Sequence, residues 1–145
     1  MRSSIKLAAI FLAAAVAAGC ASVPMAAPDA DAKAKTFQTS PDKANLYIYR
    51  NESMGAAVKM TVLLDGQLAG DTAAKTYILK SVEPGAHTLT SKTENDSNLT
   101  VNAVAGQNYF VWQEVKMGVM SARSNLQLVD EATGKAAVTE CQLVQ

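Results

Sequence analysis

The stretch ANLYIYR, residues 44–50, marks the point where the pattern of this 145-residue chain changes to that of β-strands. Leu46 and Ile48 alternate with Tyr47 and Tyr49. Successive side chains of a strand point to opposite faces, so both faces of this segment are apolar. Such a strand is typical of one that is covered on both sides. We therefore predict a buried strand over residues 44–50.

Other short segments with strand patterns follow at intervals of about 8–12 residues, which is typical of sandwiches. They are residues 58–64, 67–70, 76–82, 86–92, 99–104, 108–117, 125–130 and 137–144. Asp65-Gly66 is the two-residue signal for a type I′ hairpin, Pro84-Gly85 turns the chain between two strands that we expect to pair, and residues 131–135 form a turn. We find no amphipathic helix of convincing length. The fold predicted is all-β, an antiparallel β-sandwich of about 7–9 short strands, with an up-and-down barrel as the alternative.

The first 19 residues have the pattern of a secretory signal peptide. Arg2 and Lys6 form a basic start, and an uncharged apolar run of 12 residues extends from Leu7 to Ala18. This run is too short to cross a bilayer as a helix, which takes about 20 residues. It also lacks the polar face that the alternative, a buried N-terminal helix, would show to water. We therefore predict that residues 1–19 direct export and are removed.

The sequence VAAGCAS, residues 16–22, resembles a bacterial lipobox. Ala17, Ala18 and Gly19 are the small residues that signal peptidase would recognise directly before Cys20. The resemblance implies attachment of diacylglycerol to the Cys20 thiol, cleavage before this residue, and acylation of the new amine, as in palmitate-bearing lipoproteins. Position 17 holds Ala where the motif prefers Leu, which leaves ordinary signal-peptidase cleavage nearby as the alternative. Two or three acyl chains would anchor the chain stably.

The residues after Cys20 indicate where the anchored protein would lie. Ala21, rather than Asp, follows the cysteine. By resemblance to known sorting rules, this favours the outer membrane of a Gram-negative bacterium, with the domain facing the periplasm. Residues 20–43 are rich in Ala, Pro and Asp, so we expect a lipidated N-terminus and flexible tether. Residues 44–145 would form the β-sandwich domain.

The charge balance excludes nucleic acid as a partner. The chain has 13 basic and 13 acidic residues, and removal of residues 1–19 leaves 11 basic ones. The mature chain would then carry a net charge of about −2, with no basic patch to bind phosphates.

The residue types that carry chemistry are few. One histidine in the whole chain excludes a His-rich zinc site, and we expect no metal ion and no cofactor. If Cys20 is lipidated, Cys141 has no disulfide partner. No His or Lys stands beside Cys141 to activate it, so we predict a buried structural thiol on a strand face shared with Leu143.

The histidine lies in VEPGAHTL, residues 82–89. His87 follows the turn and shares a strand face with Leu89. We interpret it as a half-buried residue at the rim of the sandwich, and its use as a general base is the alternative. Glu83 is interpreted as a solvated turn residue.

Three further features have a structural and a functional interpretation. The loop TENDSN, residues 93–98, offers oxygen ligands without the spacing or glycine of a calcium loop, and we predict a solvated hairpin tip. The run YFVW, residues 109–112, is assigned to the core in preference to a carbohydrate-stacking surface. Arg50 ends an apolar strand, where it could pair with an acid such as Asp65 or Glu114, and we assign it a structural role in preference to one in recognition.

Several markers together resemble a known family. They are GCASVPMA (19–26), KTF (35–37), DKANLYIYR (42–50), VLLDGQLAG (62–70), VEPGAHTL (82–89) and AGQNYFVW (105–112). Their order resembles the bacterial lipoprotein family that carries the domain of unknown function numbered 2846, which is similar in layout to PEGA and carboxypeptidase-regulatory-like sandwiches. Over residues 37–145 the resemblance implies an immunoglobulin-like or prealbumin-like β-sandwich with no catalytic residue. It assigns turn and packing roles to Tyr47, Arg50, Asp65, Gly66, Pro84, Gly85, His87, Gly106 and Tyr109.

These observations predict a lipid-anchored cell-envelope protein that is not an enzyme. Its domain would be a binding or structural module in the periplasm, with the membrane and an envelope protein or cell-wall component as partners. One alternative is a small envelope hydrolase that uses His87. The other is an inhibitor of an envelope-directed enzyme, although such inhibitors often brace their loops with disulfides, which this chain lacks.

Overall fold

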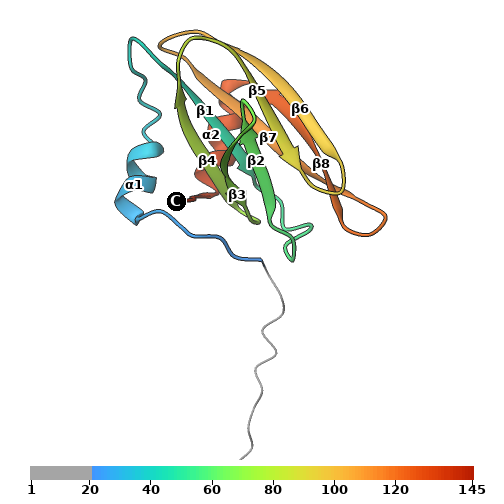
Figure 1. Cartoon of the computed structure of the whole chain (residues 1–145). Coiled ribbons are helices and arrows are strands. Elements are labelled where there is room, and N and C mark those ends of the chain that lie inside the picture. The colour runs from blue at the N-terminus through green and yellow to red at the C-terminus, as the bar shows by residue number, and fades with distance from the viewer. Residues whose placement is uncertain (1–20) are drawn as a thin grey trace, which may run out of the picture.

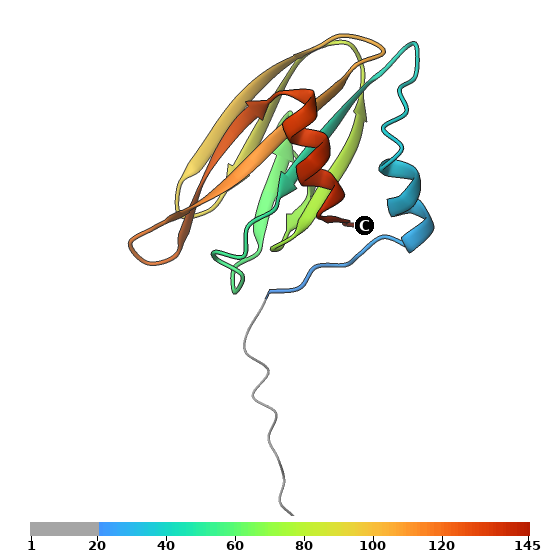
Figure 2. The ribbon, with the colours of Figure 1, turned by 180° about the vertical axis from the view of Figure 1, so that it is seen from behind.

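The computed structural model describes residues 21–145, so the predicted signal peptide and Cys20 lie outside the described residues. The described chain forms two short helices and nine strands. They are α1 (Pro28–Ala34), β1 (Ala44–Arg50), β2 (Met60–Leu64), β3 (Gln67–Thr72), β4 (Thr76–Val82), β5 (Gly85–Lys92), β6 (Asp96–Ala103), β7 (Asn108–Met117), β8 (Ala122–Val129), α2 (Glu131–Thr139) and β9 (Gln142–Leu143). The strands form two stacked sheets, and α2 lies against the outer face of one of them (Figures 1 and 2).

The two sheets confirm the predicted β-sandwich. One has the strand order β8-β7-β1-β4-β9 and the other the order β3-β2-β5-β6. The four-stranded sheet is antiparallel. The five-stranded sheet is mixed, because β1 pairs antiparallel with β4 but parallel with β7, and β9 runs parallel to β4. The antiparallel pairing predicted for the whole sandwich therefore holds throughout only the four-stranded sheet.

Strand β1 is buried on both faces, as its sequence predicts. Leu46 and Ile48 have no exposed surface and belong to the core between the two sheets. Tyr47 and Tyr49 are buried in a second core on the other face of the same sheet. The ring of Tyr47 stacks on that of Phe110, with centroids 5.1 Å apart. Strand β1 therefore separates two apolar layers.

The second core is covered by a helix where we predicted a strand. The predicted strand over residues 137–144 is wrong, because residues 131–139 form α2 and only Gln142–Leu143 are extended. The Asp130 side chain caps the helix by accepting a hydrogen bond from the Thr133 N–H at 2.8 Å. The predicted turn over residues 131–135 is accordingly the first part of this helix.

The segment predicted as a tether contains contacts with the sandwich. The Tyr47 hydroxyl donates to the Ala34 carbonyl at 2.8 Å, and the Tyr77 hydroxyl donates to the Asp31 carboxylate at 2.7 Å. Met25 forms an isolated bridge with Val144. Helix α1 thus packs on the five-stranded sheet, and the ordered fold begins before the predicted boundary at residue 44.

The chain crosses between sheets at the VEPGAHTL segment. Strand β4 pairs with β1 and β9, whereas β5 pairs with β2 and β6. The prediction that β4 and β5 form a hairpin is therefore wrong, although Pro84 does stand in the turn between them. The type I′ signal at Asp65-Gly66 is confirmed, because both residues have positive φ, of 51° and 80°.

The remaining strand boundaries follow the sequence pattern closely. The predicted segments 44–50, 76–82 and 108–117 coincide with β1, β4 and β7. The boundaries of β2, β3, β5, β6 and β8 lie within three residues of those predicted. Alternation of apolar side chains located these strands because it reports the faces that a strand buries.

A buried polar network links the two sheets at one end of the sandwich. Thr72 of β3 donates to Gln113 of β7 at 2.6 Å, and Gln113 donates to Ser91 of β5 at 2.7 Å. The Ser91 and Ser124 hydroxyls are 2.7 Å apart. All four residues are buried. Each polar group finds a partner in the opposite sheet, which fixes how the sheets are stacked.

Helix α2 approaches the sheet closely at Gly134, which is buried. A Cβ atom at this position would overlap the Phe110 side chain. We predict that Gly134→Ala destabilises the protein by about 1–3 kcal/mol in urea unfolding, because the core must move to admit the methyl group. At an open helical position the same change would stabilise by about 1 kcal/mol.

The exposed position Ala136 provides the control for this prediction. Ala136→Gly measures the helix-propensity contribution in the same helix, without a contact to Phe110. A neutral or stabilising Gly134→Ala would show that α2 does not pack against Phe110 in this way.

Candidate functional site

His87 is held by two acceptors at the end of the sandwich where β4 passes into β5. Its Nδ1 lies 2.6 Å from the Asp65 carboxylate and its Nε2 lies 2.6 Å from the Glu83 carbonyl oxygen. Asp65 also accepts a hydrogen bond from the Thr88 N–H at 2.9 Å. The ring is half-buried and its strand neighbour Val101 is fully buried. The predicted position at the rim of the sandwich is therefore confirmed.

The partners of His87 favour its charged form. A carbonyl oxygen and a carboxylate both accept hydrogen bonds, so the ring satisfies both only when both nitrogens carry a proton. The hydrogen bond to Asp65, with that to Glu83, raises the pKa of His87 above its usual value of 6.5. The same hydrogen bond and that from Thr88 lower the pKa of Asp65 below its usual 3.8.

This arrangement does not supply a general base. A serine nucleophile would need a hydrogen bond to the ring nitrogen that Asp65 does not occupy. That nitrogen, Nε2, is bonded to the Glu83 carbonyl. A protonated ring with both nitrogens engaged can accept no proton, so the geometry favours a structural role for His87.

Arg50 is fully buried and contacts carbonyl oxygens. It donates to Val58 at 2.7 Å, to Gly55 at 2.6 Å and to Thr72 at 3.3 Å. Burial lowers the pKa of Arg50, and the charge of Glu52 opposes this effect. Its hydrogen bonds hold the loop of residues 51–59 against the end of β1.

The predicted pairing of Arg50 with Asp65 or Glu114 is wrong. Asp65 bonds to His87, and Glu114 accepts from Gln127 at 2.6 Å and lies 3.3 Å from Lys116. Asp65 lies at the opposite end of the sandwich from Arg50. Glu114 lies near Arg50 along the parallel strand β7, but it alternates with the buried Gln113 and so points to the other face of the five-stranded sheet.

The TENDSN loop is bonded to the neighbouring hairpin. The Glu94 carboxylate accepts hydrogen bonds from the backbone N–H groups of Val119, Met120 and Ser121 at 2.8–3.0 Å. Asn95 bonds to both backbone groups of Ser124 at 3.0 Å. The side-chain oxygen atoms of Glu94 and Asn95 therefore organise the β7–β8 loop and the start of β8. The prediction of a solvated hairpin tip did not include this role. No sequence pattern links positions 94 and 119.

Cys141 and the YFVW residues belong to the core. Cys141 is buried, and burial raises the pKa of its thiol to about 11, which leaves it protonated and unreactive. It directly follows α2, so the shared strand face predicted for Cys141 and Leu143 is wrong. Phe110 is fully buried and Trp112 packs against the second core, in agreement with the core assignment.

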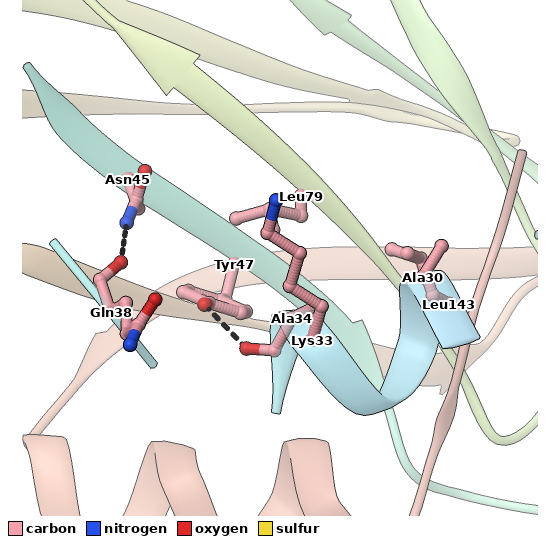
Figure 3. A pocket seen from close by; sticks show the side chains of 8 residues that line it. All are labelled: Ala30, Lys33, Ala34, Gln38, Asn45, Tyr47, Leu79 and Leu143. Carbon is pink, nitrogen blue, oxygen red and sulfur yellow. Dashed lines mark hydrogen bonds between the residues drawn. The ribbon is translucent and has the colours of Figure 1, made fainter. Parts of the chain in front are cut away.

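A shallow hollow of about 230 Å³ lies between α1 and the five-stranded sheet (Figure 3). Its lining residues are Ala30, Lys33, Ala34, Gln38, Asn45, Tyr47, Leu79 and Leu143. The Asn45 amide donates to the Gln38 carbonyl at 3.0 Å, and the Tyr47 hydroxyl donates to the Ala34 carbonyl, so the polar groups of Asn45 and Tyr47 are already engaged. The hollow is smaller than the about 300–1,000 Å³ of typical small-molecule sites.

Within residues 21–145, no group of three or more His, Cys, Asp or Glu side chains is placed to hold a metal ion. None of the helices in this range is long and apolar enough to cross a membrane.

The chain matches the family described as "Protein of unknown function (DUF2846)" over residues 40–125. It belongs to this family. A relative from Haemophilus influenzae, named "Uncharacterized protein", is 35% identical over 127 residues, which are 86% of this chain and 75% of the relative. No solved structure matches the chain.

The predicted resemblance to the DUF2846 family is thereby confirmed. The matched region includes β1 to β7 and thus His87, which lies in β5. Helix α2 and β9 follow it. Similarity to the PEGA and carboxypeptidase-regulatory-like layouts stays a prediction. The DUF2846 match points to no catalytic activity.

The His87–Asp65 pair predicts a pH dependence of stability. The raised pKa of His87 contributes stability that is present below about pH 6.5 and is lost as pH rises through the folded-state value. The lowered pKa of Asp65 contributes stability that is present above about pH 3.8 and is lost as pH falls through the folded-state value. The pair therefore stabilises most between these two limits.

We predict that Asp65→Asn lowers the free energy of unfolding by up to about 1 kcal/mol near pH 5, since Asp65 is half exposed, and by less at pH 9. Asparagine tolerates the positive φ of this turn and can still accept from Thr88. Glu83→Gln is the control, because only the backbone carbonyl of Glu83 bonds to His87. An equal loss at both pH values in urea titrations would contradict the ion pair.

Proposed function

We propose that this DUF2846 protein is a lipoprotein of the cell envelope, anchored through Cys20 after removal of residues 1–19. Recognition of Ala17, Ala18 and Gly19 before the cysteine would direct lipidation. We place it at the outer membrane of a Gram-negative bacterium, with its domain in the periplasm, since Ala21 follows the cysteine.

The observation that carries this proposal is the cysteine at the junction between a signal-peptide pattern and the start of the fold. Ala21, the next residue, already donates a hydrogen bond to the Ala56 carbonyl at 2.7 Å. A lipidated Cys20 would therefore stand at the surface of the sandwich, where an anchor needs to be.

We further propose that the domain is a non-catalytic binding or structural module for an envelope protein or cell-wall component. The environments of the histidine and of the buried cysteine support a non-catalytic role. Both ring nitrogens of His87 are engaged, and the Cys141 thiol is buried. The His87-dependent hydrolase gains no support from this geometry.

Replacement of the lipidated residue tests the anchor. We predict that Cys20→Ser leaves the protein either soluble in the periplasm or retained as uncleaved precursor, because serine offers no thiol for the lipid. Cys141→Ser is the matched control, and it should remain membrane-bound, because this residue lies in the core. Envelope fractionation and intact mass measure both variants. A mature, membrane-bound Cys20→Ser protein would contradict the proposal.

Crosslinking in intact cells tests the binding role. We predict that the wild-type chain captures envelope components that an otherwise identical anchor without residues 44–145 does not capture. Mass spectrometry of detergent-solubilised envelopes identifies them. If both forms captured identical partners, the proposed binding role of the domain would be contradicted, whereas the proposed lipid anchor would not be affected.

A further inference from the structure

Exposed apolar side chains gather at one end of the sandwich, on the loop of residues 51–59 and at the β7–β8 loop. They are Met54 (55% exposed), Met117 (84%), Val119 (87%) and Met120 (91%). The last three are the most exposed large apolar side chains in residues 21–145. Met54 and residues 115–122 line one hollow of about 280 Å³, so the two loops lie side by side. Such a patch marks an interaction surface.

The β7–β8 loop keeps its shape without packing of its own side chains. Glu94 accepts three hydrogen bonds from the backbone of residues 119–121. A Cβ atom on Gly118 would overlap the Ser121 carbonyl, so the turn requires glycine there. The loop is therefore preorganised to expose Val119 and Met120, which reduces the entropic cost of burying them against a partner.

The proposed lipid anchor would be attached to the domain at this same end. Ala21 bonds to Ala56, which lies in the loop that carries Met54. Cys20 is the residue directly before Ala21 in the sequence. In Figure 1 the described chain begins beside this loop, at the end of the sandwich opposite the β4–β5 connection.

We propose that Met54, Met117, Val119 and Met120 form a membrane-docking surface that enters the bilayer holding the Cys20 lipid. This inference rests on the proposed anchor. Residues 118–121 carry no charge, and the basic side chains on either side of the loop are already paired with acids, Lys116 with Glu114 at 3.3 Å and Arg123 with Glu94 at 3.8 Å.

Tethering makes this docking effective even though the patch is small. Attachment through Cys20 turns docking into an intramolecular event at high effective concentration. The sandwich would then stand on the membrane with the VEPGAHTL connection pointing away from it. Its outer end would be presented to the periplasm in one orientation.

An environment-sensitive fluorophore on Met120→Cys tests the proposal in the mature lipoprotein. When Cys20 is blocked as a thioether by its lipid and Cys141 is buried, the thiol introduced by Met120→Cys is the single reactive one. Ala86→Cys, exposed at the opposite end, is the matched control. The protein is reconstituted in vesicles of phosphatidylethanolamine and phosphatidylglycerol that contain a nitroxide-labelled lipid.

We expect quenching of the Met120→Cys probe by the nitroxide lipid to be about threefold or more that of the Ala86→Cys probe, because interfacial side chains enter about 5–10 Å below the headgroups. Adding Met117→Ser and Val119→Ser to the reporter should remove this difference. Flotation of the vesicles reports the anchor separately.

The outcomes separate the two proposals. Protein that floats with the vesicles while both probes are equally unquenched overturns docking and leaves the anchor standing. A change in the emission of the Met120→Cys probe that indicates burial and grows with the protein-to-lipid ratio, without quenching by the nitroxide lipid, overturns docking. It would mean that a second copy of the chain covers the patch. Wild-type protein that does not float, and whose Cys20 accepts the fluorophore, overturns both.

Discussion

The double burial of β1 is the constraint on which the rest of the structure depends. Leu46 and Ile48 need an apolar layer on one face, and Tyr47 and Tyr49 need one on the other. The four-stranded sheet supplies the first layer, and α2 with α1 supplies the second. A strand of this composition would otherwise expose two large aromatic rings to water, at a cost of about 1.5–3 kcal/mol for each large apolar side chain.

The end of β1 connects this core to the surface that faces the proposed anchor. Arg50 continues the strand with a buried guanidinium, whose hydrogen bonds are made with the loop of residues 51–59. That loop accepts a hydrogen bond from Ala21 and lies beside the β7–β8 loop. The carboxylate of Glu94, in the turn between β5 and β6, binds the backbone of the β7–β8 loop. The rigid parts of the fold thus set where Ala21, the first described residue, lies on the domain.

The candidate site was predictable only in part. Half-burial of His87 followed from its place after a turn and on the face of Leu89. Its partners did not, since Asp65 belongs to a different hairpin and Glu83 contributes a backbone oxygen. The same limit applies to Gln113, which reads as a polar residue of an alternating strand, yet is fully buried because Thr72 and Ser91 satisfy its amide. Hydrogen bonds between distant segments leave no periodic trace in a sequence.

The sequence by itself determined where β1 to β8 lie, which of their faces are apolar and where the Asp65-Gly66 turn falls, because alternation and turn chemistry are local properties. It also contained the cap of α2 in the spacing of Asp130 and Thr133, but the small residues Gly134, Ala137 and Val138 make a weak apolar stripe that resembled a strand. The tertiary structure alone decided that β4 and β5 enter different sheets, that β1 and β7 run parallel, and that Glu94 shapes the β7–β8 loop. Strand partners are chosen by burial of side chains far apart in the chain, so local sequence cannot specify them.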